Sequence, residues 1–267
     1  MSKQKICLTI AGLDPSGGAG IIADIKTFSA FGCFATAAIA SITFQNTTGV
    51  FGAVHQTADT ICGQVKPVLD DFEISAVKTG MLPTREVIEE IARLIREHCL
   101  TNIVVDPVIR STSGFDLIDD ASLQALIEML FPISTIVTPN IQEAERITGI
   151  TIRVEADIGN AARMIQSMGA GNVLIKGGHF ESETLLRQKA RDYLFTGDEN
   201  AVFEADYIDT TATHGTGCTL AAAIAANLAL GKDLKESVAI SKNFVAAAIR
   251  TAPNLGHGHS PINITRQ

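Results

Sequence analysis

The sequence predicts a doubly wound α/β fold, in which helices cover both faces of a mostly parallel central sheet. Short runs of consecutive apolar residues alternate with amphipathic helical patterns along most of the chain. Runs that are apolar on successive positions are typical of parallel strands buried on both faces. No repeat, low-complexity segment or linker interrupts this pattern. We therefore expect a single domain over residues 1–267.

Six apolar runs are the expected core strands of the sheet. They are Ile6–Ile10, Ala35–Thr43, Ile74–Lys78, Asn102–Val105, Thr135–Val137 and Val173–Ile175. The clearest helix is expected over Thr84–His98, because its apolar residues recur at helical spacing on one face. Thr84 is the expected N-cap of this helix, and Glu86 lies in its first turn.

The last third of the sequence predicts an antiparallel hairpin, two helices rich in small residues, and a tail. In chain order these segments are Tyr193–Phe195 with Val202–Phe203, Gly217–Leu230, Leu234–Thr251 and Pro253–Gln267. We expect the tail to be loosely ordered. Its His257-Gly258-His259 run is therefore interpreted as part of a mobile segment and not as a metal site.

Composition excludes several classes of protein. Hydrophobic residues make up 46% of the 267 residues, which is enough for a sizeable core. The formal net charge is −8 and no basic run occurs, so nucleic acid is not expected as a main partner. The five cysteines are widely spaced without a C-x-x-C pair, which favours a reducing, cytoplasmic location. The apolar stretches are too short to span a membrane.

A first glycine loop, Gly12–Gly20, follows an expected strand and precedes an expected helix. Gly12 and Gly17 have the separation of a Walker A motif, but Gly18 stands where that motif needs a lysine. The glycines do not fit G-x-G-x-x-G either. The loop is interpreted either as a close backbone approach to a small ligand or as a tight turn between strand and helix.

A second glycine loop, Thr213–Thr219, opens an alanine-rich helix. Gly215 and Gly217 leave backbone amides uncovered where the helix dipole favours an anion. The same field is expected to lower the pKa of the Cys218 thiol from about 8.5 toward neutrality, so that it can act as a base or stabilise a nearby hydroxyl. The alternative is a buried cysteine that only packs at the start of the helix.

Both loops and several segments between them resemble hydroxymethylpyrimidine/phosphomethylpyrimidine kinases. The matching segments are Thr9–Gly20, Ala23–Phe28, Gln45–Thr47, Gly80–Leu82, Asp106–Val108, Thr138–Asn140, Glu143–Ala144, Lys176–His179 and Thr213–Thr219. They occur in the family's order. Cys218 stands where most ribokinase-like sugar kinases have a catalytic aspartate. This difference narrows the resemblance to the cysteine-containing branch of those kinases.

The resemblance implies a ribokinase-like fold, the use of ATP with Mg²⁺, and a homodimer. It also implies two successive reactions. The first phosphorylates the hydroxymethyl group of 4-amino-5-hydroxymethyl-2-methylpyrimidine, and the second phosphorylates the resulting monophosphate. The expected partners are therefore a small pyrimidine substrate and ATP.

Four residues match family positions around the substrate, namely Gln45, Gly12, Asp24 and Met81. A side-chain amide such as that of Gln45 pairs well with a ring nitrogen and a neighbouring amino group. Three of them also have a structural alternative. Gln45 is otherwise a polar residue at a strand end, Met81 is ordinary core, and Asp24 is an acidic residue near a helix start.

The resemblance also implies the residues of phosphoryl transfer. Lys176 matches the family's phosphate-contacting lysine, and Thr216 and Gly217 are expected at the ATP phosphates. Cys218, Lys176, Gly215 and Gly217 form the expected catalytic group. The structural alternative for Lys176 is a solvated side chain after a strand.

Asp106, Asn140 and Glu143 resemble the family's groups near Mg²⁺. Mg²⁺ keeps several waters and needs few carboxylates, so these residues suit it. Asn140 and Glu143 also have the spacing of a helix capping box, and the two roles are compatible.

The sequence departs from the family at two places. In the family, the stretch after Asp-Pro-Val forms a lid and commonly reads Ala-Lys-Ser-Gly. Here it reads Ser111-Thr112-Ser113-Gly114, so the usual lysine is missing. Ala212 replaces the usual asparagine before the second glycine loop.

Two other functions stay open. A pyridoxal kinase of the same cysteine-containing branch is the nearest, because pyridoxal also carries a hydroxymethyl group on a nitrogen ring. Certain kinases of that type have a second lid cysteine, where this chain has Ser111. The other is a non-catalytic nucleotide-binding regulator, against which the intact Lys176 and Cys218 argue.

Overall fold

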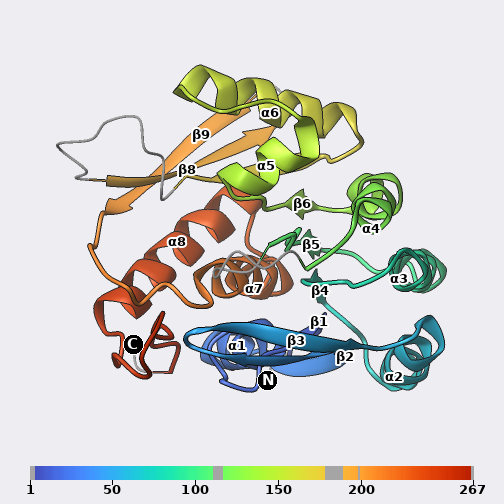
Figure 1. Cartoon of the computed structure of the whole chain (residues 1–267). Helices are drawn as coiled ribbons and strands as arrows, with labels where there is room; N and C mark the ends of the chain where they lie inside the picture. Colours follow the sequence, from blue (N-terminus) through green and yellow to red (C-terminus); the bar gives the residue numbers. More distant parts are fainter. Residues whose placement is uncertain (1–3, 111–116, 178–188, 198, 266–267) are drawn as a thin grey trace.

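The computed structural model describes residues 4–110, 117–177, 189–197 and 199–265. Within them a 9-stranded sheet has the order β3-β2-β1-β4-β5-β6-β7-β8-β9 (Figure 1). The strands are β1 Ile6–Leu13, β2 Phe34–Asn46, β3 Gly49–His55, β4 Ala76–Thr79, β5 Ile103–Val105, β6 Ile136–Val137, β7 Asn172–Lys176, β8 Lys189–Thr196 and β9 Glu199–Asp206.

The middle of the sheet is parallel and its two edges are antiparallel. Strands β2, β1, β4, β5, β6 and β7 run parallel, whereas β3, β8 and β9 pair antiparallel with their neighbours. The fold class expected from the sequence is confirmed. After β1 the chain continues to β2 on one side and later returns to β4 on the other. In open α/β sheets, ligands bind beyond the carboxyl ends of the strands at such a reversal.

Helices pack on both faces of the sheet. They are α1 Gly20–Ala30, α2 Ala58–Asp71, α3 Arg85–Glu97, α4 Asp120–Ala125, α5 Ile141–Thr148, α6 Glu155–Ser167, α7 Thr216–Ala229 and α8 Leu234–Arg250. Buried residues of α2 to α6 form one core with one face of the strands, and those of α1, α7 and α8 form a second core with the other face (Figure 1). Among the described residues, no helix combines the length and apolarity that a membrane crossing requires.

Local sequence signals explain where several elements begin. Helix α3 starts after Thr84, whose hydroxyl accepts a hydrogen bond from the Val87 amide. Each of the six apolar runs overlaps a strand, although β4, β5 and β6 begin one or two residues later than expected, and the late hairpin is the β8–β9 pair. The expected strands did not include β3, which pairs with the end of β2 and carries exposed Phe51 and Val54. An exposed edge strand lacks the continuous apolar run that marks a buried one.

The expectation of a loosely ordered tail was wrong. Ile262 and Ile264 are buried against Ala23 of α1 and Ala248 of α8. The Asn263 amide also donates to the Ala248 carbonyl at 3.0 Å. The tail has few apolar residues, but these two fill a gap beside two helices, and burial of each side chain stabilises the segment. Residues 254–265 are called the C-terminal strap below.

Candidate active site

A cavity of about 1370 Å³ lies at the carboxyl ends of the central strands and the start of α7. Ligand pockets for one small molecule have about 300–1,000 Å³, so this cavity has room for two substrates. Its walls include most of the residues expected at the site. Those are Gly12, Gln45, Met81, Asp106, Asn140, Glu143, Lys176, Gly215, Thr216, Gly217 and Cys218.

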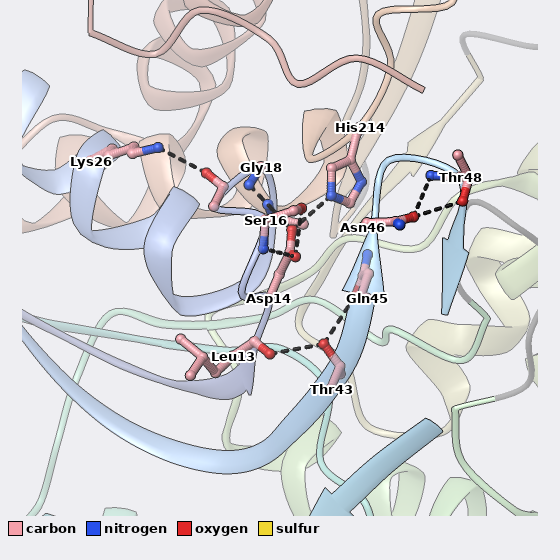
Figure 2. A network of polar contacts seen from close by, with 12 residues as sticks. Leu13, Asp14, Ser16, Gly18, Lys26, Thr43, Gln45, Asn46, Thr48 and His214 are labelled. Carbon is pink, nitrogen blue, oxygen red and sulfur yellow. Dashed lines mark hydrogen bonds and ion pairs between the residues drawn. The ribbon is translucent and has the colours of Figure 1, made fainter. Parts of the chain in front are cut away.

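The first glycine loop is folded around the carboxylate of Asp14 (Figure 2). One carboxylate oxygen accepts from the Ser16 amide at 2.8 Å and from its hydroxyl at 2.7 Å. The other accepts from the amides of Gly18 at 3.2 Å and Ala19 at 2.9 Å. His214 Nε2 lies 2.7 Å from the same oxygen. Burial acts to raise the pKa of Asp14, but the hydrogen bonds from His214 and Ser16 hold it below its usual range.

The Asp14–His214 contact joins the two glycine loops, which are 200 residues apart in the sequence. Sequence reasoning missed this pair. It also missed why both loops need glycine: a Cβ on Gly215 would lie 1.8 Å from the carbonyl oxygen of Gly18, and one on Gly18 would lie 2.3 Å from His214 Cδ2. The loops therefore contact each other through their backbones.

On the side of the cavity formed by β1 and β2, Gln45 lies close to Gly12 and its neighbours. Gln45 Oε1 accepts a hydrogen bond from Thr43 Oγ1 at 3.2 Å, and that hydroxyl is 2.9 Å from the Leu13 carbonyl oxygen (Figure 2). A Cβ on Gly12 would lie 3.3 Å from Met81 Sδ, so Gly12 lets Met81 approach the backbone of β1. Met81 is nearly buried and still reaches the cavity wall.

Asp24 does not line the cavity, in contrast to the other expected residues. It is 0% exposed on α1, and its Oδ2 accepts from Lys78 Nζ at 2.9 Å and from Thr9 Oγ1 at 2.6 Å. The other carboxylate oxygen, Oδ1, is buried without a hydrogen-bond partner among the described residues. Asp24 is therefore held behind the cavity wall, where its ion-pair partner Lys78 lines the cavity.

Lys78 was missing from the expected site. Burial acts to lower its pKa, but the negative charge of Asp24, together with that of other acidic groups nearby and the hydrogen bond to Asp24, raises the pKa above its usual range. Burial raises the pKa of Asp24, and Lys78 and Thr9 offset that effect only in part. The available signal in the sequence was a lysine at the carboxyl end of an apolar strand, where strand ends face the ligand.

Lys176 lies at the end of β7 between two carboxylates. Its Nζ is 2.8 Å from Asp106 Oδ1 and 3.8 Å from Glu143 Oε2. Asp106 also accepts from Thr138 Oγ1 at 3.2 Å. Burial acts to raise the pKa of Asp106, but the charges of Lys176 and Lys78 hold it below its usual range. Lys176 is therefore not the solvated side chain of the structural alternative.

Asn140 and Glu143 form the capping box that their spacing predicts at the start of α5. The Glu143 amide donates to Asn140 Oδ1 at 2.9 Å, and the Asn140 amide donates to Glu143 Oε2 at 2.8 Å. Both residues also line the cavity. Burial raises the pKa of Glu143 to about 7, although the charge of Lys176 acts to lower it.

The described residues contain no group of three or more His, Cys, Asp or Glu side chains that is arranged to hold a metal ion. Asp106 and Glu143 instead share the ammonium group of Lys176. Their oxygen donors nevertheless suit Mg²⁺, which takes one or two carboxylates and completes its shell with water and substrate phosphates. The donor set therefore fits a Mg²⁺ ion that arrives with a nucleotide.

The second glycine loop leaves the start of α7 open to the cavity. Gly215 is its N-cap, with a φ of 84° that favours glycine, and no side chain caps the helix. A Cβ on Gly217 would lie 3.3 Å from Lys176 Nζ, so the ammonium group stands beside the first turn. Backbone amides, the helix dipole and Lys176 together are arranged to suit an anion, and we call this group the candidate anion site. The Thr216 hydroxyl donates to the Thr213 carbonyl oxygen at 3.0 Å.

Cys218 lies in this first turn, as the sequence predicts, but the expected lowering of its pKa is not found. Burial raises the pKa of the thiol to about 11, and the charge of Lys78 offsets this only in part. The carboxylates of Asp24 and Asp106 act in the same direction as burial. Without a ligand, Cys218 is therefore a neutral thiol at physiological pH.

A further buried ion pair stands beside Lys176 and was not expected from the sequence. Lys242 Nζ of α8 lies 2.7 Å from Asp192 Oδ2 of β8, and the Gly177 amide lies 3.2 Å from the other oxygen of that carboxylate. Two expected features, the lid stretch 111–114 and the residues 178–179 after Gly177, lie outside the described residues.

Comparisons with known proteins agree with this geometry. A family model described as phosphomethylpyrimidine kinase matches residues 14–263. The hydroxymethylpyrimidine/phosphomethylpyrimidine kinase of Bacillus subtilis is 43% identical over 256 residues, which cover 96% of this chain and 93% of that protein.

Two solved structures are also similar. A phosphomethylpyrimidine kinase from Clostridium difficile has a TM-score of 0.80 and 40% identity, and the match covers 92% of this chain and 100% of that chain. An ADP complex of Bacillus subtilis pyridoxal kinase has a TM-score of 0.88 and 37% identity, and covers 98% of both chains. This chain therefore belongs to the phosphomethylpyrimidine kinase family.

Proposed function

We propose that this kinase transfers phosphate from ATP to 4-amino-5-hydroxymethyl-2-methylpyrimidine and then to its monophosphate, in thiamine biosynthesis. The names of the relatives support this substrate class. The observation that carries the proposal is a single cavity with Gln45 on one wall and the Lys176–Gly217 anion site on another. A small ring with a projecting hydroxymethyl group matches that arrangement.

In this proposal the ATP phosphates lie against the open first turn of α7 and Lys176. The amides of Gly217 and Cys218 and the ammonium group stabilise charge on the group in transfer, and catalysis is mainly positioning and electrostatics. Asp106, Asn140 and Glu143 would hold Mg²⁺, directly or through water. When bound, the ion neutralises charge on the ATP phosphates.

Cys218 is proposed to receive the proton of the hydroxymethyl group in the first reaction. Since its pKa is about 11 without ligands, it acts as a strong base that is present in small amount at neutral pH. Lys78, the side chain whose charge lowers this pKa, supplies part of the thiolate's stabilisation. The monophosphate needs no such base, because its second pKa is about 6 and its oxygens are ionised at neutral pH.

Pyridoxal is the second candidate substrate, because a pyridoxal kinase is among the similar structures. The decisive experiment measures ADP release with hydroxymethylpyrimidine, its monophosphate and pyridoxal in parallel. We expect turnover with both pyrimidines, each at a higher kcat/KM than pyridoxal. Turnover with pyridoxal alone would replace the proposed substrate, and no turnover with any of them would favour a nucleotide-binding regulator.

The Gln45 assignment has its own test. Gln45→Leu leaves the aminopyrimidine edge unpaired in a partly buried site, which costs about 1–3 kcal/mol of binding. The KM for hydroxymethylpyrimidine should rise accordingly, while the KM for ATP stays the same. Asn46→Leu is the matched control, since the exposed Asn46 side chain accepts hydrogen bonds from Thr48 and from no other residue in the part of the chain that the structure describes. An unchanged KM in Gln45→Leu would refute the assignment.

We further propose that the working protein is a homodimer formed through the β2–β3 hairpin. Ile42, Phe44 and Val54 are 39%, 53% and 51% exposed, and Ile42 pairs with Val54 across the hairpin. Exposed apolar patches of this kind mark interaction sites. Light scattering should give twice the chain mass for the wild type and a lower mass for Phe44→Glu. A wild-type protein of single chain mass would contradict the proposal.

A further inference from the structure

The C-terminal strap, residues 254–265, crosses the tip of the β2–β3 hairpin. The His259 amide donates to the Thr47 carbonyl oxygen at 2.8 Å, and the Gly258 amide donates to the Thr47 hydroxyl at 3.4 Å. Thr47 lies two residues after Gln45, which is proposed to recognise the pyrimidine ring. The strap is therefore attached by its backbone next to the ring-recognising residue.

The same strap also contacts both glycine loops. The His259 ring nitrogen Nδ1 is 3.2 Å from the Thr213 hydroxyl, and the His214 amide donates to the Ser260 carbonyl oxygen at 3.3 Å. A Cβ on Gly18 would lie 3.0 Å from the Cβ of Pro261. His259 and Thr213 both line the cavity. Four consecutive residues, 258–261, thus join the hairpin, the first glycine loop and the second glycine loop.

We propose that the C-terminal strap is a positioning element, which fixes the distance between the β2–β3 hairpin that carries Gln45 and the second glycine loop. This inference rests on the proposed function, because it concerns a phosphate acceptor that contacts both the hairpin and the second glycine loop. Transfer needs the acceptor hydroxyl within about 3–3.5 Å of the transferred phosphorus, and a misplacement of about 1 Å can cost about a hundredfold in rate. A nucleotide bound without an acceptor would contact the second glycine loop, and its binding would not require the hairpin.

The glycines of the strap make this contact possible. A Cβ on Gly258 would lie 2.1 Å from the Thr47 carbonyl oxygen, and one on Gly256 would lie 2.2 Å from the Thr47 hydroxyl oxygen. A non-bonded carbon and oxygen do not approach so closely, so either substitution must push the strap and the hairpin apart. Gly49, at the start of β3, has no atom within 4 Å of an added Cβ. It provides a matched control in the same hairpin.

The test compares Gly258→Ala with Gly49→Ala. In Gly258→Ala we expect kcat with hydroxymethylpyrimidine to fall by about a hundredfold and its KM to rise, since the acceptor is misplaced. The dissociation constant for ADP, measured by calorimetry, and the slow hydrolysis of ATP without acceptor should stay at the wild-type value. Gly49→Ala should match the wild type in all four quantities.

A second variant keeps the inference testable if Gly258→Ala does not fold. His259→Ala removes the ring contact with Thr213 but leaves the backbone bond to Thr47, so we expect the same pattern with a smaller loss. Wild-type kinetics for both variants, or a loss of ADP affinity in step with kcat, would overturn the inference. If the wild type phosphorylates pyridoxal alone, the proposed function fails, and the same comparison with pyridoxal decides the role of the strap.

Discussion

Two lysines at the carboxyl ends of parallel strands form ion pairs at this site, and their surroundings differ. Lys78 and its partner Asp24 are both 0% exposed, and among the described residues only one oxygen of that carboxylate is hydrogen-bonded. The side chain of Lys176 is 14% exposed and is shared by Asp106 and Glu143. Lys78 is therefore a fixed charge, whereas Lys176 faces a cavity where phosphate oxygens can take the place of one carboxylate.

The carboxylates around Lys176 favour such an exchange. Burial raises the pKa of Glu143 to about 7, so this group is readily protonated near neutral pH. Asp106 keeps its charge, because Lys176 and Lys78 outweigh the effect of burial on its pKa. A thiolate at Cys218 is among the causes that raise the pKa of both lysines. The comparison teaches that both lysines act on the thiol electrostatically, but only Lys176 combines this with a partly exposed position between two carboxylates.

The largest effect is expected from breaking the buried Lys78–Asp24 ion pair. Lys78→Met leaves the Asp24 carboxylate buried without its cation, and breaking such a pair costs about 3–5 kcal/mol of unfolding free energy. Adding Asp24→Leu should recover part of that stability, because no unpaired charge remains. Urea denaturation measures both. Lys66→Met removes an exposed pair with Asp70 and should leave the free energy of unfolding almost unchanged, because water screens such a pair.

Equal losses in Lys78→Met and Lys66→Met would show that the pair at Lys78 is not sealed from water. No recovery in the double variant would show that packing, and not the stranded charge, dominates the loss. Either outcome would remove the physical difference between the two lysines.

Lys176→Ala tests the role of the second lysine, which faces the cavity. It removes a cation from the anion site, and the loss of one such stabilising donor lowers kcat by about 10²–10³-fold, or about 2.7–4 kcal/mol. The pyrimidine should still bind, which equilibrium dialysis measures. Lys189→Ala is a control for loss of an exposed lysine that pairs with Asp206. A variant with near wild-type turnover would show that Lys176 does not contact the transferred group.

The smallest effect is expected at Cys218, between the two lysines. Cys218→Ala should lower turnover of hydroxymethylpyrimidine by about a hundredfold, the lower end for a lost general base, and that of the monophosphate much less. Because the pKa of the thiol is about 11, its ionised fraction rises with pH throughout the range below that value. The wild-type rate of the first reaction should therefore increase from pH 7 to pH 10.

This pH dependence separates a base from a packing residue. It should be absent in Cys218→Ala and weak for the monophosphate in the wild type. Equal losses on both substrates would mean that Cys218 only shapes the anion site.

Local signals in the sequence were enough for much of this molecule. Apolar runs give the buried strands, because a strand covered on both faces has apolar side chains on successive positions. Thr84 and Asn140 mark helix starts, since an N-cap acts on amides two or three residues away. The resemblance directed attention to Gln45, Lys176 and Cys218, which all line one cavity. Each of these inferences concerns a residue and its near neighbours in the chain.

Only the tertiary structure decided how distant charges are paired and how deeply they are buried. Asp24 and Lys78 are 54 residues apart, and Lys242 and Asp192 are 50 apart. The helix position of Cys218 alone predicts a lowered pKa, but burial and two carboxylates from other elements raise it. The strap is ordered by contacts with Thr47, Thr213 and His214. Burial and through-space electrostatics depend on every surrounding atom, and a sequence pattern records only the neighbours along the chain.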